Sequence, residues 1–219
     1  MEHLTTKYIQ KSFYETKVLP LLSFLYTDTM YSNKYDYYRI KDILDQYSSG
    51  QLESKRWAID ELNNCAPISQ EDLVVVIGGW YGLMSHMLCE SGVTNTIMDY
   101  EIDETCIDLH YKLKVHDNIM IEYQDGFEIF DSREHNGNDK VIICTACEHI
   151  DGDDLYGYVA MKNPKSTILL QSNNMHNIDS HVNCHDSLDD FIDSLPLDKI
   201  LYKGTKKIGD YERYMVIAR

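Results

Sequence analysis

The feature that most constrains the fold is an alternation of short apolar runs with helical patterns, which begins at Leu73. The first run, Leu73–Ile77, has no polar residue, as expected for a strand that is covered on both faces of a sheet. Further strand-like runs occupy residues 96–100, 118–123, 140–145 and 166–171, with helical patterns at 83–90 and 104–113. Strands that alternate with helices predict right-handed crossovers and a mostly parallel sheet.

The last part of the sequence has a different pattern. Residues 188–195 read as a helix, and two strand-like stretches, 199–203 and 211–218, are joined by a polar connection over 204–210. Two strands joined in this way predict a hairpin, which adds antiparallel pairing to the sheet. The predicted fold class is therefore α/β, a Rossmann-like, mostly parallel seven-stranded sheet with a terminal antiparallel hairpin strand.

Residues 1–70 show the helical spacing of apolar side chains and are predicted to form an α-helical N-terminal extension or cap. The stretch Asn63–Pro67 breaks this pattern, which places a boundary near residue 70 and the Rossmann-like domain at 71–219. Tyrosines are frequent in the extension. They are expected either to cap a pocket at the sheet edge or to pack over the sheet: Tyr26, Tyr31, Tyr35, Tyr37 and Tyr38.

The formal net charge of −16 argues against a broad nucleic-acid footprint, because phosphate binding needs a basic face. No apolar run approaches the ~20 residues that span a bilayer, and the first residues lack the basic-then-apolar order of a signal peptide. Six cysteines, several within apolar runs, read as small buried side chains in a reducing compartment. A cytoplasmic protein without a membrane partner is expected.

Glycines and acids follow the first three strands, where a parallel sheet binds its ligands. The loop Gly78–Gly82 allows positive φ and close approach of a ligand, and the helix after it offers unpaired N–H groups. Glu101 ends the second strand, where a carboxylate can accept both hydroxyls of a ribose; Asp99, inside that strand, is less favoured. Asp125 ends the third strand and is suited to an adenine amino group, with Phe127 against the ring. Each acid alone is equally a surface or turn residue, but together with the loop they predict a ribose-bearing cofactor.

This arrangement resembles the class I S-adenosylmethionine-dependent methyltransferases over residues 71–219, terminal hairpin included. Members carry a G-x-G-x-G loop after the first strand and acids that end the second and third. Two positions depart from that pattern: Trp80 replaces the middle glycine, and Val76 stands where an acid usually precedes the loop. The loop is therefore expected to meet the methionine part of the cofactor differently. The sequences G-G-W-Y-G and C-E-H-I are also similar to a group of poorly characterised, phage-type methyltransferases.

The resemblance implies S-adenosylmethionine as the cofactor. The expected cofactor-binding residues follow the first four strands: Gly78, Gly79, Trp80, Tyr81, Gly82, Glu101, Ile102, Asp125, Gly126, Phe127 and Thr145. In this fold the loop after the fourth strand faces the methyl group and the acceptor. Glu148 or His149 is suited to orient or deprotonate the acceptor, although a structural role is slightly favoured for His149.

The fifth strand leads into a polar stretch in which Asn173 is the expected contact to the acceptor. Several possible zinc ligands follow, but their spacing matches no familiar closed site, so no metal is predicted: His176, His181, Cys184 and His185. The Asp/Asn-Pro-Pro-aromatic sequence of enzymes that methylate amino groups of nucleic acids is missing after the fourth strand. Together with the charge, this disfavours a DNA base as acceptor and leaves RNA open.

The leading hypothesis is a methyltransferase that acts on a small-molecule or protein acceptor. An NAD-dependent oxidoreductase shares the opening strand, loop and helix, but the G-x-G-x-x-G sequence is missing and the terminal hairpin argues against it. A third possibility is a module that binds S-adenosylmethionine or a nucleotide without turnover, because Val76 and Trp80 alter the loop. The acceptor, the oligomeric state and the activity itself are not determined by these patterns.

Overall fold

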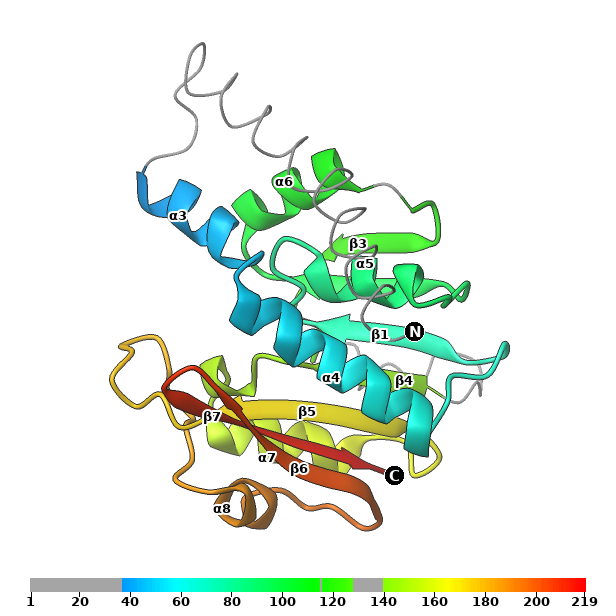
Figure 1. Ribbon diagram of the computed structural model, residues 1–219. Coiled ribbons are helices and arrows are strands. Elements are labelled where there is room, and N and C mark those ends of the chain that lie inside the picture. Colours follow the sequence, from blue (N-terminus) through cyan, green and yellow to red (C-terminus); the bar gives the residue numbers. More distant parts are fainter. Residues whose placement is uncertain (1–36, 115, 128–139) are drawn as a thin grey trace, which may run out of the picture.

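Seven strands form one sheet at the centre of the protein, whose computed structural model describes residues 37–114, 116–127 and 140–219 (Figure 1). Their order across the sheet is β3-β2-β1-β4-β5-β7-β6. The strands are β1 (Leu73–Ile77), β2 (Ile97–Glu101), β3 (Ile119–Tyr123), β4 (Lys140–Cys144), β5 (Thr167–Asn173), β6 (Ile200–Ile208) and β7 (Tyr211–Ala218). Strands β1 to β5 run parallel, whereas β7 is antiparallel to both β5 and β6. The predicted fold class is confirmed.

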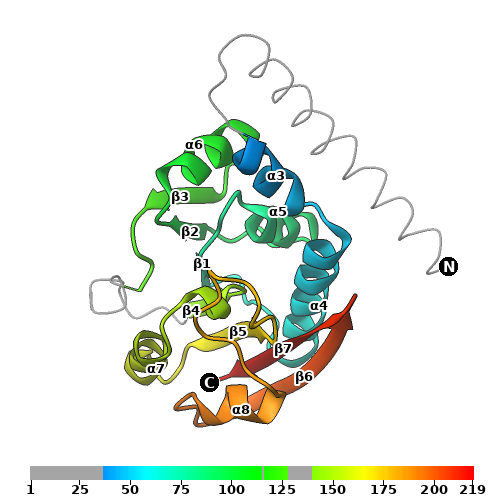
Figure 2. The same cartoon turned by 90° about the vertical axis from the view of Figure 1, so that its left-hand side faces the viewer.

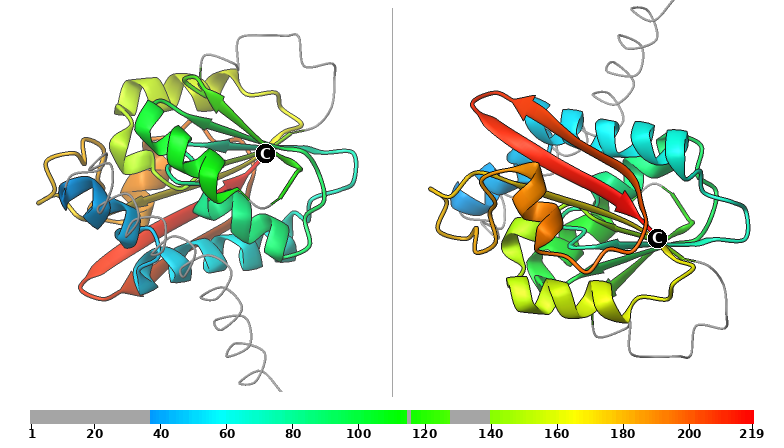
Figure 3. Two further views of the ribbon diagram at one scale, coloured as in Figure 1. Left: turned by 90° about the horizontal axis from the view of Figure 1, so that it is seen from above. Right: turned by 90° about the horizontal axis from the view of Figure 1, so that it is seen from below.

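Helices cover both faces of this sheet (Figure 3). They are α3 (Tyr37–Asp45), α4 (Ser49–Cys65), α5 (Leu83–Glu90), α6 (Glu104–Leu113), α7 (Gly152–Met161) and α8 (Leu188–Asp193), with a 3-10 turn, η3, at Cys147–His149. Helices α4, α5 and α6 share a core with Val74 and Val76 of β1. Helices α7 and α8 share the other core with Val75 and Ile77. Alternate residues of each strand point to opposite faces, which divides the core into these two layers.

Strand β1 lies where the order of the sheet reverses, since its two neighbours are β2 and β4. Val76 is paired with Asp99 of β2 on one side and with Ile143 of β4 on the other. The crossover after β1 runs through α5 on one face, and the crossover after β4 runs through α7 on the other. The loops after β1 and β4 therefore diverge at the carboxyl ends of these strands, which is the place where open α/β sheets bind their ligands.

Helix α4 is part of the sheet's own core. Its N-cap Ser48 accepts a hydrogen bond from the Gln51 amide, and its side chains Trp57, Ala58 and Leu62 are buried against the strands. The predicted division of the chain near residue 70 stays a prediction. The helices predicted within residues 1–36 lie outside the described residues, as do Tyr26, Tyr31 and Tyr35. In the described part of the chain, no helix combines the length and the apolar character that crossing a bilayer requires.

One local prediction was wrong, and one helix was missed. The polar connection expected over 204–210 is mostly strand, because β6 continues to Ile208 and only Gly209 and Asp210 form the turn. Lys206 and Lys207 pair with Arg213 and Glu212 in this edge strand, one face of which meets solvent, so polar side chains are compatible with strand there. Helix α7 was not predicted, although Asp151 caps it by accepting a hydrogen bond from the Asp153 amide.

Candidate functional site

The loops that follow the parallel strands meet at one edge of the sheet, which Figure 2 views from the front. The sequence-predicted residues after β1, β2, β3, β4 and β5 all lie on this edge, since parallel strands end on the same side. The loop after β1 and the acid after β2 form one half of the site. The 3-10 turn η3 after β4 and the long segment after β5 form the other half.

The Gly78–Gly82 loop has three residues with positive φ. The φ angles are +68° at Gly78, +54° at Trp80 and +85° at Gly82, and Trp80 is the non-glycine residue in this conformation. The amides of Gly78 and Gly79 both donate to the carbonyl of Tyr100, at 3.0 and 3.1 Å. The loop is thus fastened to the end of β2, beside the acids predicted to bind the cofactor.

Two glycines of this loop lie against buried polar side chains. A Cβ atom on Gly79 would overlap the carboxylate of Asp99, and a Cβ atom on Gly82 would overlap the imidazole of His110. Asp99 also accepts a hydrogen bond from the Ser85 hydroxyl of α5. The protein's own packing beneath the loop therefore requires glycine, without a side chain, at both positions.

Asp99 is fully buried in this arrangement, and burial raises the pKa of its carboxyl group to about 7. The Ser85 hydroxyl opposes this shift, and the charge of Glu101 adds to it. His110 of α6 lies near the same carboxylate, with its Nδ1 atom 4.0 Å from Oδ2. Asp99 lies beneath the loop and is not exposed to solvent, whereas the sequence suggested only a less favoured ribose ligand at this position.

Glu101 is held in a fixed orientation by three backbone amides. Its Oε2 atom accepts from the Trp80 amide at 2.7 Å, which joins the end of β2 to the middle of the glycine loop. Its Oε1 atom accepts from Ile102 and Asp103, at 2.8 and 3.0 Å. Oε1 thus accepts two hydrogen bonds and Oε2 accepts one, so of the roughly four acceptor sites of a carboxylate one stays on Oε2 for a ribose hydroxyl.

The Trp80 side chain explains how this loop tolerates the missing glycine. The ring packs against a small core formed by α3, α6 and the loop itself, with Ile43 and Leu109 at its centre. Its centroid lies 5.1 Å from the ring of Tyr81. The side chain joins this packing, while the backbone amide of Trp80 faces Glu101.

The predicted adenine-binding residues line the next part of the edge. Asp125 is half-buried, and its Oδ1 atom accepts from the amide of Phe127 at 2.9 Å. Phe127 stacks on Tyr158 of α7, with ring centroids 3.6 Å apart and planes 11° apart. Gly126 packs on Tyr100, and Ile102 beside Glu101 is 68% exposed. An exposed isoleucine next to a fixed carboxylate offers an apolar surface for an aromatic ring.

On the other half of the site, Glu148 is buried and forms an ion pair with Arg213 of β7. The Arg213 Nη1 atom donates to Glu148 Oε1 at 2.6 Å, and its Nη2 atom donates to the carbonyl of Thr145. The Glu148 Oε2 atom is also buried, and it accepts no hydrogen bond from any residue that the structure describes. Arg213 reaches this position because β7 pairs with β5, which places Arg213 opposite Asn173.

The segment after β5 packs against η3 through backbone hydrogen bonds. The amides of Val182 and Asn183 donate to the Glu148 carbonyl, at 2.8 and 3.0 Å. The His149 ring is exposed, and its Nδ1 atom lies 3.0 Å from the Ser180 carbonyl. The contacts bring residues from two distant parts of the sequence together beside Glu148.

Of the four possible zinc ligands named from the sequence, for which no metal was predicted, His181 lies with Glu148 and His149. Its ring centroid lies 4.6 Å from that of His149, edge to face. Burial lowers the pKa of His181, and the Glu148 charge opposes that shift. His176 lies apart and pairs with Asp186, with its Nε2 atom 3.0 Å from Oδ1.

Asn173 is fully buried at the end of β5. Its Oδ1 atom accepts from the Met175 amide at 2.8 Å and from the Cys184 thiol at 3.3 Å. Its Nδ2 group finds no partner among the described residues. The side chain predicted to contact the methyl acceptor therefore has an unused hydrogen-bond donor. A buried donor without a partner is costly, which marks this side chain as one that a ligand would satisfy.

Three residues of this edge were missed by the sequence reasoning. Arg39 of α3 donates to the Tyr81 hydroxyl at 3.1 Å and forms an ion pair with Asp103 at 2.9 Å. Lys55 of α4 is buried, donates to Gln51 at 2.6 Å, and has a pKa lowered to about 7 by burial and by the charge of Arg213. No local pattern indicates Arg39 or Arg213, because each contacts groups far away in the sequence, and the Lys55–Gln51 contact within one helix does not by itself indicate a place at this edge.

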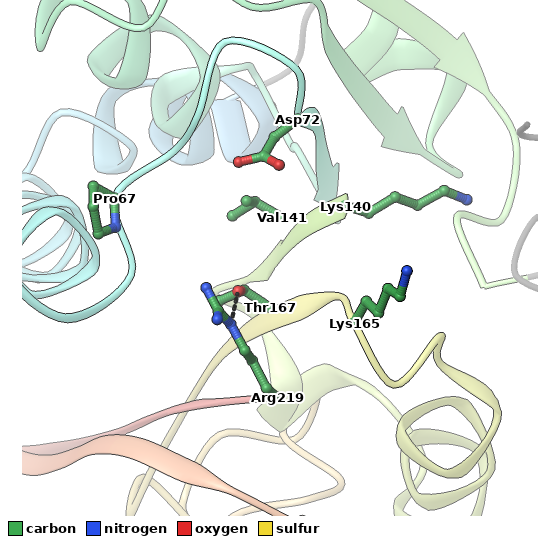
Figure 4. Close-up of a pocket in the computed structure, with 7 residues that line it drawn as sticks. All are labelled: Pro67, Asp72, Lys140, Val141, Lys165, Thr167 and Arg219. Carbon is green, nitrogen blue, oxygen red and sulfur yellow. Dashed lines mark hydrogen bonds between the residues drawn. The ribbon is translucent and has the colours of Figure 1, made fainter. Parts of the chain in front are cut away.

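A hollow of about 220 Å³ lies at the opposite edge of the sheet, where β1, β4 and β5 begin (Figure 4). Its walls are Pro67, Asp72, Lys140, Val141, Lys165, Thr167 and Arg219. Arg219 closes one side by donating to the Thr167 hydroxyl at 3.1 Å. The amino ends of the strands carry none of the loop residues discussed above, so this hollow is separate from the candidate site.

Solved structures with the same fold include several S-adenosylmethionine-dependent methyltransferases. One from Anabaena variabilis ATCC 29413 gives a TM-score of 0.57 at 12% identity and covers 75% of this chain and 85% of that chain. The N-methyltransferase NodS from Bradyrhizobium japonicum WM9 gives 0.57 at 13% identity and covers 80% and 98%. Magnesium protoporphyrin IX methyltransferase from Synechocystis PCC 6803, solved with bound S-adenosylmethionine, gives 0.52 at 13% identity and covers 97% and 95%.

These similarities establish the shared class I fold. No family model and no curated protein matches the chain.

Proposed function

We propose that this protein is an S-adenosylmethionine-dependent methyltransferase that acts on a small-molecule or protein acceptor. The observation that carries the proposal is the contact between Glu101 and the Trp80 amide, at 2.7 Å, which joins a ribose-type acid to a glycine loop. The fold shared with solved methyltransferases supports it. The strand order and the C-terminal hairpin weigh against an NAD-dependent oxidoreductase.

The described residues fit the parts of S-adenosylmethionine in the order of the strands. Glu101 would accept a ribose hydroxyl with the remaining lone pair of Oε2, and the exposed Ile102 would cover one face of the adenine. Asp125 would accept from the adenine amino group. The exposed Gly78 leaves room for the methionine part, because a Cβ atom there would meet only Ala146, at 3.6 Å.

When bound, the cofactor supplies a sulfonium methyl group, and the chain's task is to orient the acceptor in line with it. Asn173 would donate its unused Nδ2–H to the acceptor. Glu148 would orient polar groups through its buried carboxylate, fixed by Arg213. His149 is exposed on the same turn and would take the acceptor's proton where one must be removed.

The acceptor we propose is a small molecule or a protein, and a DNA base is disfavoured. The net charge of −16 would repel a polyanion, and the cations closest to the acceptor side are engaged within the protein. Arg213 is paired with Glu148, and Lys55 donates to Gln51. Because the sequences G-G-W-Y-G and C-E-H-I resemble those of phage-type methyltransferases, we propose that the protein belongs to that group. We also propose that it acts in the cytoplasm.

Equilibrium titration with S-adenosylmethionine, S-adenosylhomocysteine and NAD tests the cofactor assignment. Both sulfur compounds should bind, and Glu101→Gln should weaken them by about tenfold or more, since a charge-assisted hydrogen bond is worth roughly 1.5–3 kcal/mol. Glu122→Gln is the matched control, because Glu122 is an exposed acid on the neighbouring strand. Binding of NAD alone would identify an oxidoreductase instead, and lack of binding to either sulfur compound would reject the proposal.

A second assay separates an enzyme from a module that only binds the cofactor. Radiolabelled methyl groups from S-adenosylmethionine would be followed into small molecules and proteins of a cell extract. Transfer that depends on the protein and is reduced in Asn173→Ala supports the methyltransferase. Tight cofactor binding without any transfer would show a binding module.

A further inference from the structure

A compact set of ligand-type side chains lies at the acceptor end of the site. The set, called here the metal cluster, consists of Glu148, His149 and His181. One donor atom from each residue lies within 4.8 Å of the other two. We propose that this cluster binds a divalent transition-metal ion, a site that the spacing in the sequence does not indicate.

The carboxylate of Glu148 provides the independent observation that points to a cation. Its side chain is only 5% exposed, and Arg213 occupies Oε1 alone. The second oxygen, Oε2, is buried and accepts nothing from the described part of the chain. A buried carboxylate oxygen without a partner is costly, and a bound cation removes that cost.

His149 is already oriented as a metal ligand. Its Nδ1 atom lies 3.0 Å from the Ser180 carbonyl, and because a carbonyl can only accept, the ring proton belongs on Nδ1. The Nε2 atom then keeps its lone pair for a metal, and in the metal-bound protein the ion, in place of His149, would activate the acceptor. A hydrogen bond from the other ring nitrogen to a backbone carbonyl is the usual way in which ligating histidines are oriented.

The backbone brings His181 to this place without a metal. The Val182 and Asn183 amides donate to the carbonyl of Glu148. Val182, the residue that follows His181, is therefore hydrogen-bonded to the backbone of a residue of the metal cluster. The His181 amide also donates to the Ile178 carbonyl at 2.9 Å, which closes a turn. The three side chains are thus positioned by folding alone.

The donor set selects the kind of ion. Two imidazole nitrogens and one carboxylate oxygen suit iron(II), manganese, cobalt or zinc, whereas calcium and magnesium prefer oxygen ligands alone. Two ligands of one ion lie at most ~4.2 Å apart, twice the usual metal–ligand distance of about 2.1 Å. The spread of 4.8 Å therefore closes with small side-chain rotations. Three protein ligands leave positions open for water or for a substrate.

The open positions suggest what the ion would do, and this step rests on the proposed function. The cluster follows β4 and β5, at the end of the site assigned to the acceptor. Arg213 is the cation beside it, and its charge favours a negatively charged oxygen as the remaining ligand. We therefore expect the acceptor to present a hydroxyl oxygen that the metal holds and activates.

The test measures metal binding directly, without cofactor or acceptor. The full chain is stripped with a chelator and titrated with Co²⁺ followed by its visible absorption, and with Zn²⁺ and Mn²⁺ by equilibrium dialysis. One ion per chain is expected. His149→Ala and His181→Ala should each weaken binding by at least about tenfold, since even changes to groups behind the ligands cost 10–100-fold. Both positions are at least partly exposed, so the variants should fold.

His176→Ala is the matched control, a histidine of the same segment that lies outside the cluster and pairs with Asp186. It should bind metal as the unaltered protein does. Equal binding by His149→Ala and the unaltered protein, or no saturable binding at all, would overturn the inference. S-Adenosylmethionine titration of His149→Ala separates the two proposals, because cofactor binding should persist when the metal is lost.

Discussion

Gly79 and Asp99 are in direct contact, with the glycine backbone of the loop resting on the buried carboxylate of β2. This contact links the shape of the cofactor loop to an ionisable group that solvent does not reach. The loop geometry at Trp80, and through it the position of Glu101, therefore depends on what lies beneath Gly79.

Gly79→Ala should disrupt the loop, because the added methyl group overlaps the Asp99 carboxylate. Forcing extra volume into packed structure costs about 1–3 kcal/mol, and a shift of the loop or of the Asp99 side chain to relieve the overlap would disturb the contact between Trp80 and Glu101. We expect a lower unfolding free energy in urea and weaker S-adenosylmethionine binding. Gly157→Ala is the control, since no atom lies near its added methyl group, and in helix α7 it should be neutral or slightly stabilising.

Asp99 should make stability fall as the pH rises. Its folded-state pKa of about 7 lies above the usual 3.8, so the folded protein holds a proton that the unfolded chain has released between these values. The contribution is complete below pH ~4, is lost as the pH rises to about 7, and changes no further above that, with a slope on the order of 1 kcal/mol per pH unit. His110 and Glu101 face the same carboxyl group.

Asp99→Asn removes this proton and keeps a partner for Ser85. Urea unfolding of both proteins at pH 5, 6, 7 and 8 should show a flatter profile for the variant, which gains relative stability with rising pH. Parallel profiles would mean that Asp99 is not the responsible group.

Breaking the ion pair between Arg213 and Glu148 should be strongly destabilising. Arg213→Met leaves a buried carboxylate uncompensated, and loss of one partner of such a pair costs about 3–5 kcal/mol. Adding Glu148→Gln should recover part of this loss in metal-free protein. Lys203→Met provides the comparison, because its pair with Asp189 is largely exposed and is worth about 0–1 kcal/mol. Additive effects of the two buried substitutions would contradict the coupling.

Arg39→Ala should weaken cofactor binding without unfolding the protein. Arg39 is partly exposed and connects α3 to the Tyr81 hydroxyl, so its loss frees the loop from the helix above it. We expect a reduction of severalfold in affinity, equivalent to about 1 kcal/mol for one hydrogen bond. Lys41→Ala removes a neighbouring exposed cation of the same helix and should leave the affinity unchanged.

The strands and helices of the sheet could be predicted because each is encoded by the pattern of apolar residues within its own short segment. The apolar run at Leu73–Ile77 became β1 with the same bounds, and the helices at Leu83–Glu90 and Glu104–Leu113 also keep their predicted bounds. The half of the site around Glu101 could be predicted for the same reason, since the position of an acid relative to the end of a strand can be read from the sequence. The contact to Trp80 follows from two adjacent strands.

The acceptor half could not be predicted in this way, because its contacts depend on the order of the strands. Arg213 meets Glu148 only because β7 inserts beside β5, and no spacing in the sequence encodes that. His181 meets His149 through a backbone turn whose hydrogen bonds have no side-chain signature. The interpretation of possible zinc ligands considered spacing along the segment after β5 alone, and therefore did not compare His181 with His149.

The placement of β7 has a consequence for the order in which parts of the protein can fold during its synthesis. A ribosome releases β1 to β4 and the loop around Glu101 well before it releases Arg213. Until then β5 is an unpaired edge, and the Glu148 carboxylate has no counter-ion to be buried with. The nascent chain would thus complete its cofactor half first and remain exposed to aggregation at the β5 edge until the hairpin closes.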